Sequence, residues 1–384
     1  MGCDVKTFDP GLKKKTIILC VLFLFSYSIT PYSITSVEYI KKEVQMTHPT
    51  NRDWLAQIQE ETLEPDLPIC DPHHHLWEFR NERSAPRYLI NDYLVDINCG
   101  HKIVSTVFIE CGAMWRANGP EEMVVIGETE FVNGIAAMSA SGLYGSCKIA
   151  DGIICTADLM LGADVGRVLD AQISAGNGRV RGIRYAIVWD GSGVPPQGRT
   201  KAPQYLMYNE TFRQGFGELA KRDLSYEIWC YHPQLPDVID LAQNFPDTKM
   251  ILDHFGGPLG VGPYVGNSDE VFFDWKKNIK ELAKCPNVVA KLGGINMIEN
   301  GFGWHEKPKP PTSKELMEAT RHYYDFTIEQ FGIDRCMFES NFPVDQVTCS
   351  YNTLWNSFKL LTKTYSADEK IRLYHDNASR VYRL

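Results

Sequence analysis

A regular alternation of two kinds of segment is the feature that most constrains the fold of this 384-residue chain. From about residue 67 onward, short apolar runs rich in β-branched residues alternate with longer stretches of helical periodicity. Helices are expected, for example, at Tyr205–Lys221, Pro236–Phe245 and Ser313–Phe331. The runs that read as strands are Ile69–His75, Val104–Cys111, Gly152–Met160, Val180–Val188, Ser225–Pro233, Lys249–Gly257, Asn287–Ile295 and Arg335–Pro343.

Eight strand–helix alternations predict a parallel sheet that closes into a (β/α)8 TIM barrel, an α/β fold of one domain. A doubly wound open sheet is the competing fold, but its first turn is usually rich in glycine, whereas the first strand here ends in histidines. The barrel is assigned to residues 67–384, a short helical lead-in to 46–66 and an N-terminal extension to 1–45. The long loops at 190–203, 255–267 and 301–312 follow strands, so they gather on the carboxyl face of the barrel.

Composition narrows the class of protein. A hydrophobic content of 44% is ample for a sizeable core. A formal net charge of -9, without a Lys/Arg stripe interleaved with aromatics, excludes a nucleic-acid-binding surface. The 11 cysteines are scattered and contain no C-x-x-C pair, which indicates thiols in a reducing compartment and favours a cytoplasmic barrel.

The N-terminus points the other way. Lys13, Lys14 and Lys15 precede an apolar run from Thr16 to Phe25, a pattern typical of a signal peptide or signal anchor. The run is shorter than the ~20 apolar residues that a membrane span needs. Two alternatives therefore stay open for residues 16–30: membrane association or secretion through this segment, or an extension without a structural role.

Polar residues at the strand ends indicate a site. In the run His73-His74-His75, strand alternation places His73 and His75 on one side and His74 on the other. Each such residue alone has a structural explanation, but four histidines at the carboxyl ends of three strands favour a divalent metal or a cluster that polarises a carbonyl group. The other candidates are Glu110, Arg184, Tyr231, His232, Asp253, His254, Glu339, Asn341 and Asp345.

At this point the sequence resembles a known family. Asp71-Pro72-His73-His74-His75-Leu76-Trp77, Leu252-Asp253-His254-Phe255-Gly256-Gly257 and Phe338-Glu339-Ser340-Asn341-Phe342-Pro343-Val344 are similar to motifs of the amidohydrolase superfamily. The resemblance is to the amidohydrolase-related branch of metal-dependent TIM-barrel hydrolases, which includes lactonases, and it covers residues 67–384. It implies that His73, His75, His232 and His254 bind a divalent metal, with Zn²⁺ the first candidate, or contact the substrate carbonyl as in metal-free members.

One position departs from the family pattern. The eighth strand of the family usually ends in Ser-Asp-x-Pro, whose Asp is the general base, and here that position is Asn341. A carboxamide has no basic site, so it cannot take a proton from water. Three interpretations follow: Glu339 supplies the carboxylate, Asp345 reaches back from its loop, or the hydrolytic step is lost.

The expected function is hydrolysis of the C–O bond of a small acidic lactone. A metal or a histidine cluster polarises the carbonyl, a carboxylate such as Glu339 or Asp345 works as acid and base, and Arg184 anchors a substrate carboxylate. Glu110 and Tyr231 are expected to contact the substrate. Non-oxidative decarboxylation on the same barrel and a catalytically silent barrel are the alternatives, and the sequence does not indicate an oligomeric state.

Overall fold

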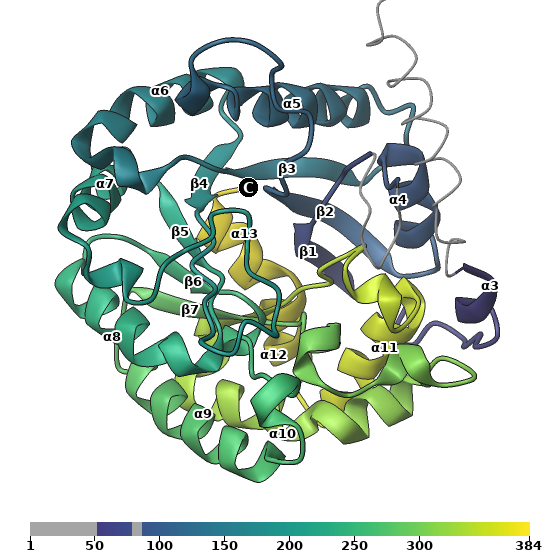
Figure 1. Cartoon of the computed structure of the whole chain (residues 1–384). Helices are drawn as coiled ribbons and strands as arrows, with labels where there is room; N and C mark the ends of the chain where they lie inside the picture. The colour runs from purple at the N-terminus through teal and green to yellow at the C-terminus, as the bar shows by residue number, and fades with distance from the viewer. Residues whose placement is uncertain (1–51, 79–86) are drawn as a thin grey trace, which may run out of the picture. The chain divides into compact units, whose positions relative to one another are not determined.

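The computed structural model describes residues 52–78 and 87–384, and in them eight parallel strands pair in the order β1 to β8 (Figure 1). The predicted (β/α)8 barrel is confirmed. The predictions for residues 1–45, including the apolar segment at 16–30, lie outside the described residues. The strands are β1 Pro68–His74, β2 Lys102–Ile109, β3 Lys148–Cys155, β4 Val180–Arg184, β5 Ser225–Ile228, β6 Met250–Leu252, β7 Val288–Leu292 and β8 Cys336–Phe338.

A helix follows each strand, and the helices form a ring around the sheet (Figure 1). Within the described parts of the chain, no helix combines the length and the apolar character that a membrane crossing requires. The helices that follow the strands are α4 Ile90–Ile97, α5 Ile126–Ala140, α6 Val165–Ala175, α7 Glu210–Ala220, α8 Leu235–Asn244, α9 Ser268–Leu282, α10 Ser313–Phe331 and α11 Tyr351–Leu361, after which come α12 Ala367–Ile371 and α13 Asn377–Tyr382.

Several strands are shorter than the sequence predicts, β6 and β8 most of all. β6 and β8 have three residues each, because the chain leaves the sheet at residues with left-handed backbone. His254 and Phe255 after β6 have φ values of 51° and 59°, and Asn341 after β8 has a φ of 55°. Such values are uncommon for residues other than glycine and end the regular strand geometry. His254 and Asn341 therefore lie just beyond these two strands, in the turns that open the loops.

The lead-in also differs from the prediction. Helix α3 spans only Arg52–Leu55, and the residues up to Pro65 continue without helix. Side chains of α11 bind this segment instead: Asn352 donates to the carbonyl of Glu60 at 2.7 Å, and Lys359 donates to that of Leu63 at 2.7 Å. These bonds satisfy backbone groups that a helix would otherwise pair internally.

The C-terminal helix closes the amino-terminal end of the barrel. Ala378, Val381 and Tyr382 of α13 pack into a buried apolar cluster inside the barrel. Arg383 donates to the carbonyl of Asp223, just before β5, which places this helix at the end of the strands opposite the histidines. The strand residues of this cluster are Cys70, Val107, Ile109, Ile154, Ile251, Val289 and Met337.

Asp71 holds the seam where the barrel closes. The segment after β8 pairs with β1, with the amide of Asn341 donating to the carbonyl of His73 at 2.9 Å. The buried carboxylate of Asp71 accepts from the Ser340 hydroxyl at 2.6 Å, the Ser340 amide at 3.0 Å and the Tyr351 hydroxyl at 2.9 Å. The aspartate of the first motif is therefore a structural residue that ties β1 to the end of β8.

We predict that Asp71→Ala lowers the free energy of unfolding by about 3–5 kcal/mol, because it leaves several buried donors without an acceptor. Urea unfolding followed by circular dichroism measures the change. Asp247→Ala, at an exposed aspartate, is the matched control and should change stability by less than about 0.5 kcal/mol. Equal unfolding midpoints for Asp71→Ala and the wild type would contradict this role.

Candidate active site

A layer of charged side chains crosses the barrel above the apolar cluster. Side chains two residues apart on a strand point to the same side. Val289 and Lys291 therefore both point inward from β7, and Ile251 and Asp253 both point inward at β6. Arg184 at the end of β4 and Glu227 on β5 belong to the same layer. These charged residues are buried, so each must be paired to remain charged.

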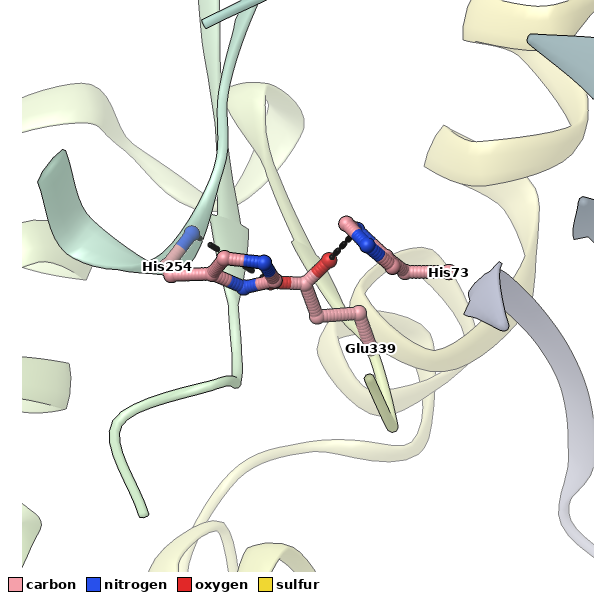
Figure 2. A group of neighbouring side chains, drawn as sticks. All are labelled: His73, His254 and Glu339. Carbon is pink, nitrogen blue, oxygen red and sulfur yellow. Dashed lines mark hydrogen bonds and ion pairs between the residues drawn. The ribbon is translucent and has the colours of Figure 1, made fainter. Parts of the chain in front are cut away.

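Glu339 lies between two histidines (Figure 2). Its Oε2 is 2.7 Å from Nδ1 of His73, and its Oε1 is 2.7 Å from Nδ1 of His254. Both imidazoles thus donate their Nδ1–H to one carboxylate, and the two ring centroids are 4.5 Å apart. His75 is oriented in the same way, since its Nδ1 donates to the carbonyl of Ile109 at 2.8 Å. Such bonds fix the tautomer that presents Nε2 as the reactive nitrogen.

The charges around Glu339 shift its pKa and that of His254 in opposite directions. Burial opposes ionisation of Glu339, but the adjacent imidazoles of His254 and His73 outweigh burial and lower the pKa of the carboxyl. Burial likewise disfavours the imidazolium of His254, but the charge of Glu339 outweighs it and raises the pKa of His254. The pair therefore behaves as a carboxylate beside an imidazole that readily takes a proton.

Lys291 lies directly below this pair. Its Nζ is 2.8 Å from Glu227 Oε2, 3.2 Å from Asp253 Oδ1, 3.2 Å from His73 Nδ1 and 3.7 Å from Glu339 Oε2. Burial disfavours the ammonium, but the carboxylates of Asp253 and Glu227 outweigh it and raise the pKa of Lys291. A permanent positive charge therefore sits in the floor of the site.

Arg184 connects this floor to the loop at 190–203. Its Nε donates to Glu110 Oε1 at 2.9 Å, and one terminal nitrogen lies 3.3 Å from Nε2 of His73 and 3.5 Å from Asp253 Oδ2. Arg199 of the loop pairs with the other carboxylate oxygen of Glu110 and donates to the carbonyl of Cys111. The loop is also held by the Tyr231 hydroxyl, which donates to the carbonyl of Pro196 at 2.5 Å.

A cavity of about 690 Å³ opens above these groups. It is lined by His254, His75, Arg184 and Asn341, whereas Glu339, with no exposed surface, does not reach it. His73, Asp253 and Lys291 are equally buried and also lie beneath the cavity rather than in its wall. His254 is thus the residue that contacts both the cavity and Glu339. Other lining residues include Glu110, Trp115, Glu121, Glu122, Asp158, Arg199, Trp229, Tyr231 and Glu299.

Of the expected ligand histidines, His232 lies away from the buried group. His232 begins a short 3-10 helix after β5, where its Nδ1 accepts the amide N–H of Leu259 at 3.2 Å and its ring packs on Tyr264. The structure therefore does not bring His232 into the group formed by His73, His254 and Glu339. His74 faces outward from the barrel as expected, stacked on Tyr93 at 4.3 Å between centroids.

Asn341 and Asp345 form a pair at the cavity wall. Nδ2 of Asn341 donates to Oδ1 of Asp345 at 3.0 Å. Asp345 is fully buried and does not line the cavity, so only Asn341 is exposed to a ligand. Burial raises the pKa of Asp345 to about 7. Of the two carboxylates expected to replace the missing aspartate, Glu339 faces the histidines and Asp345 lies behind Asn341.

Sequence reasoning did not identify Lys291, Glu227 and Arg199. The sequence does contain a sign of Lys291: it is a charged residue in the apolar run Val288–Leu292, two residues after an inward valine. Glu227 stands in a similar position on β5. Arg199 gave no such signal, because its position depends on the path of the loop.

Comparison with known proteins places the chain in a family. The amidohydrolase family model matches residues 70–384. This chain belongs to the amidohydrolase family. An uncharacterised protein of Sinorhizobium fredii, y4mH, is 34% identical over 83% of this chain and 99% of its own length. An L-fucono-1,5-lactonase of Burkholderia multivorans is 26% identical over 45% of this chain and 56% of its own length.

Solved structures share the fold of this amidohydrolase. A Burkholderia multivorans amidohydrolase with bound zinc aligns with a TM-score of 0.62 at 21% identity, over 82% of this chain and 99% of that one. A manganese-bound 5-carboxyvanillate decarboxylase of Novosphingobium aromaticivorans aligns with a TM-score of 0.52 at 11% identity, over 84% and 97%. At these identities the likeness concerns the barrel alone.

Members of the amidohydrolase superfamily bind divalent metals, and His73, His254 and Glu339 are the residues that could hold one here. The ligand atoms of His73, His254 and Glu339 lie within 4.8 Å of one another, and their types suit zinc. Their surroundings do not fit. The Lys291 ammonium lies 3.2 Å from His73 Nδ1 and 3.7 Å from Glu339 Oε2, so it would repel a divalent ion bound at these residues. The carboxylates that would offset this repulsion already pair with Lys291 and Arg184. As arranged, the group does not accommodate a divalent ion.

We predict that Asp345→Asn stabilises the protein at neutral and alkaline pH. The folded-state pKa of about 7 exceeds the ordinary value of 3.8, so the folded protein binds this proton more tightly than the unfolded chain. The resulting stability is fully present below about pH 4 and is lost as the pH rises to about 7, a difference of roughly 4 kcal/mol at most. Asn cannot ionise and retains an acceptor for Asn341.

Thermal unfolding at about pH 4 and pH 8 measures this effect. The gain in Tm of Asp345→Asn over the wild type should be present at pH 8 and small at pH 4. Asp247→Asn, at an exposed aspartate, should show no difference between the two. A loss of stability at pH 8 would mean that Asp345 is ionised in a favourable pair.

Proposed function

We propose that this amidohydrolase opens a small lactone by hydrolysis of its C–O bond, with the Glu339–His254 pair moving the proton. The observation that carries the proposal is the geometry of this pair. A buried carboxylate lies beneath the cavity, 2.7 Å from Nδ1 of an imidazole that lines the cavity. A carboxylate–imidazole pair of this kind acts as a general base and then as a general acid.

The steps follow from these contacts. His254 takes a proton from water at Nε2 while the water oxygen attacks the lactone carbonyl carbon, and Glu339 stabilises the imidazolium through Nδ1. The ring C–O bond then breaks, and His254 returns the proton to the leaving oxygen. The product is the open-chain hydroxy acid.

Arg184 supports the negative charge that develops on the carbonyl oxygen. A guanidinium has five N–H groups, and the contacts to Glu110, His73 and Asp253 use four of them. One N–H therefore stays available beside the cavity that Arg184 lines. A fixed cation near the reacting oxygen lowers the barrier without having to reorient.

The cavity charge supports a lactone of a sugar acid over one that carries further carboxylates. Both arginines of the lining, Arg184 and Arg199, are already paired with Glu110. The other charged lining residues, Glu121, Glu122, Asp158 and Glu299, are acidic, and of these Glu122 pairs with Arg167 outside the lining. Trp115 and Trp229 offer flat apolar faces for the carbon atoms of a ring. The expected acidic substrate is therefore refined to the ring form of a sugar acid, in which the carboxyl group is esterified, in keeping with the L-fucono-1,5-lactonase relative.

We predict that a panel of aldonolactones identifies the substrate, with acid release followed by a pH indicator. Lactones with a free carboxylate should have lower kcat/KM because of repulsion by the acidic lining. Carbon dioxide is measured in parallel with the corresponding carboxylic acids, since its release without ring opening would establish a decarboxylase instead. The absence of turnover on the lactone panel would contradict the function proposed here.

We predict that His254→Gln lowers kcat/KM about 10²- to 10⁴-fold, the usual contribution of a general acid–base group. Glu339→Gln removes the charge that raises the pKa of His254, so the acid limb of the pH–rate profile should move to lower pH as kcat falls. His322→Gln, at an exposed histidine on α10, is the matched control and should keep wild-type kinetics. An unshifted pH profile in Glu339→Gln would remove the pair from the mechanism.

A further inference from the structure

Lys291 is a buried charge inside the barrel with four polar contacts, and the steps proposed above do not use it. Its ammonium lies within 3.7 Å of three carboxylates, those of Glu227, Asp253 and Glu339, and 3.2 Å from Nδ1 of His73. The side chain has no exposed surface and does not line the cavity. Contact with a substrate therefore does not explain its position.

The contacts of Lys291 overlap with those that a metal would make. His73 and Glu339 belong to the group whose atoms could hold a divalent ion, and the Lys291 ammonium faces both of them. The other ring nitrogen of His73 faces a second cation, since an Arg184 nitrogen lies 3.3 Å from Nε2. Both nitrogens of this imidazole are thus next to positive charge. Because Nδ1 donates its N–H to Glu339, Nε2 carries the lone pair that a metal would use, and this lone pair already faces Arg184.

The position of the ammonium is fixed from below as well. Glu227, its nearest carboxylate, accepts a hydrogen bond from the Tyr382 hydroxyl at 2.7 Å. Tyr382 comes from the helix that closes the amino-terminal end of the barrel, and its ring lies 5.6 Å from the Lys291 ammonium. Contacts from β5, β6 and α13 therefore hold the charge in place, so it is a built part of the site.

We propose that the Lys291 ammonium is the resident cation of this centre and takes the place of a divalent metal. It holds the carboxylates of Asp253 and Glu339 in the arrangement that presents Glu339 to His254 and His73. Lys291 is thus a positioning residue. Its effect on turnover depends on the proposed lactone hydrolysis, but its effect on metal binding does not.

Metal content and Co²⁺ binding of the full-length protein test this proposal. The wild type is expected to contain far less than one divalent ion per chain by elemental analysis, and to bind added Co²⁺ weakly by visible absorption. Lys291→Met removes the ammonium and should tighten Co²⁺ binding at least about tenfold. Lys291→Met combined with Glu227→Gln removes the carboxylate left unpaired by the first change, and it is measured if the single variant does not fold.

Two further variants make the test specific. Lys291→Arg keeps the charge and should retain the weak Co²⁺ binding of the wild type. Lys359→Met removes another buried lysine, which binds carbonyl groups of the lead-in, and should leave Co²⁺ binding unchanged. Circular dichroism establishes that each variant is folded.

Two results would overturn the proposal. One is a wild-type protein that is purified with one divalent ion per chain and releases it to a chelator. The other is equal Co²⁺ affinity in the wild type and in the folded Lys291 variants that lack the ammonium. If no lactone is hydrolysed, the function proposed above fails while these metal measurements still decide the role of Lys291.

Discussion

The buried charge of Lys291 is the constraint on which the interior of this barrel depends. Removing an ammonium from water costs several kcal/mol, and only well-placed anions offset that cost. The barrel supplies Glu227 and Asp253 from neighbouring strands at 2.8 and 3.2 Å. Because each of these ion pairs must stay intact, the ends of β5, β6 and β7 are fixed relative to one another. The histidines are then placed against a rigid floor.

Barrel closure completes this arrangement. His73 lies on the first strand and Glu339 after the last, so they meet at 2.7 Å only because the segment after β8 pairs with β1. Asp71 holds that seam through Ser340, which directly follows Glu339. The motif at the start of the chain thus has two functions: Asp71 positions the end of the sheet, and His73 receives the carboxylate that arrives there.

The sequence predicted the architecture well because its signals are periodic. Alternating strands and helices indicated the barrel, and Ser313–Phe331 was predicted with the bounds of α10. The prediction of the site was less complete, for physical reasons. Sequence spacing cannot show that the turn after β5 directs His232 toward Leu259, because this depends on local backbone geometry. The strand pattern places Lys291 at an inward position. Its role could not be inferred from the sequence, because it depends on which carboxylates of other strands lie next to it.

The change at the end of β8 has a consequence for the path of the proton. In the family pattern a carboxylate occupies the position of Asn341, which here lines the cavity. This chain carries its carboxylate two residues earlier, at Glu339, on the same side of the strand but one layer lower and without exposed surface. A carboxylate at that depth reaches imidazole nitrogens at 2.7 Å but not a ligand in the cavity. A proton from a ligand or water in the cavity can therefore reach Glu339 only through an imidazole, and His254 lines the cavity and contacts Glu339.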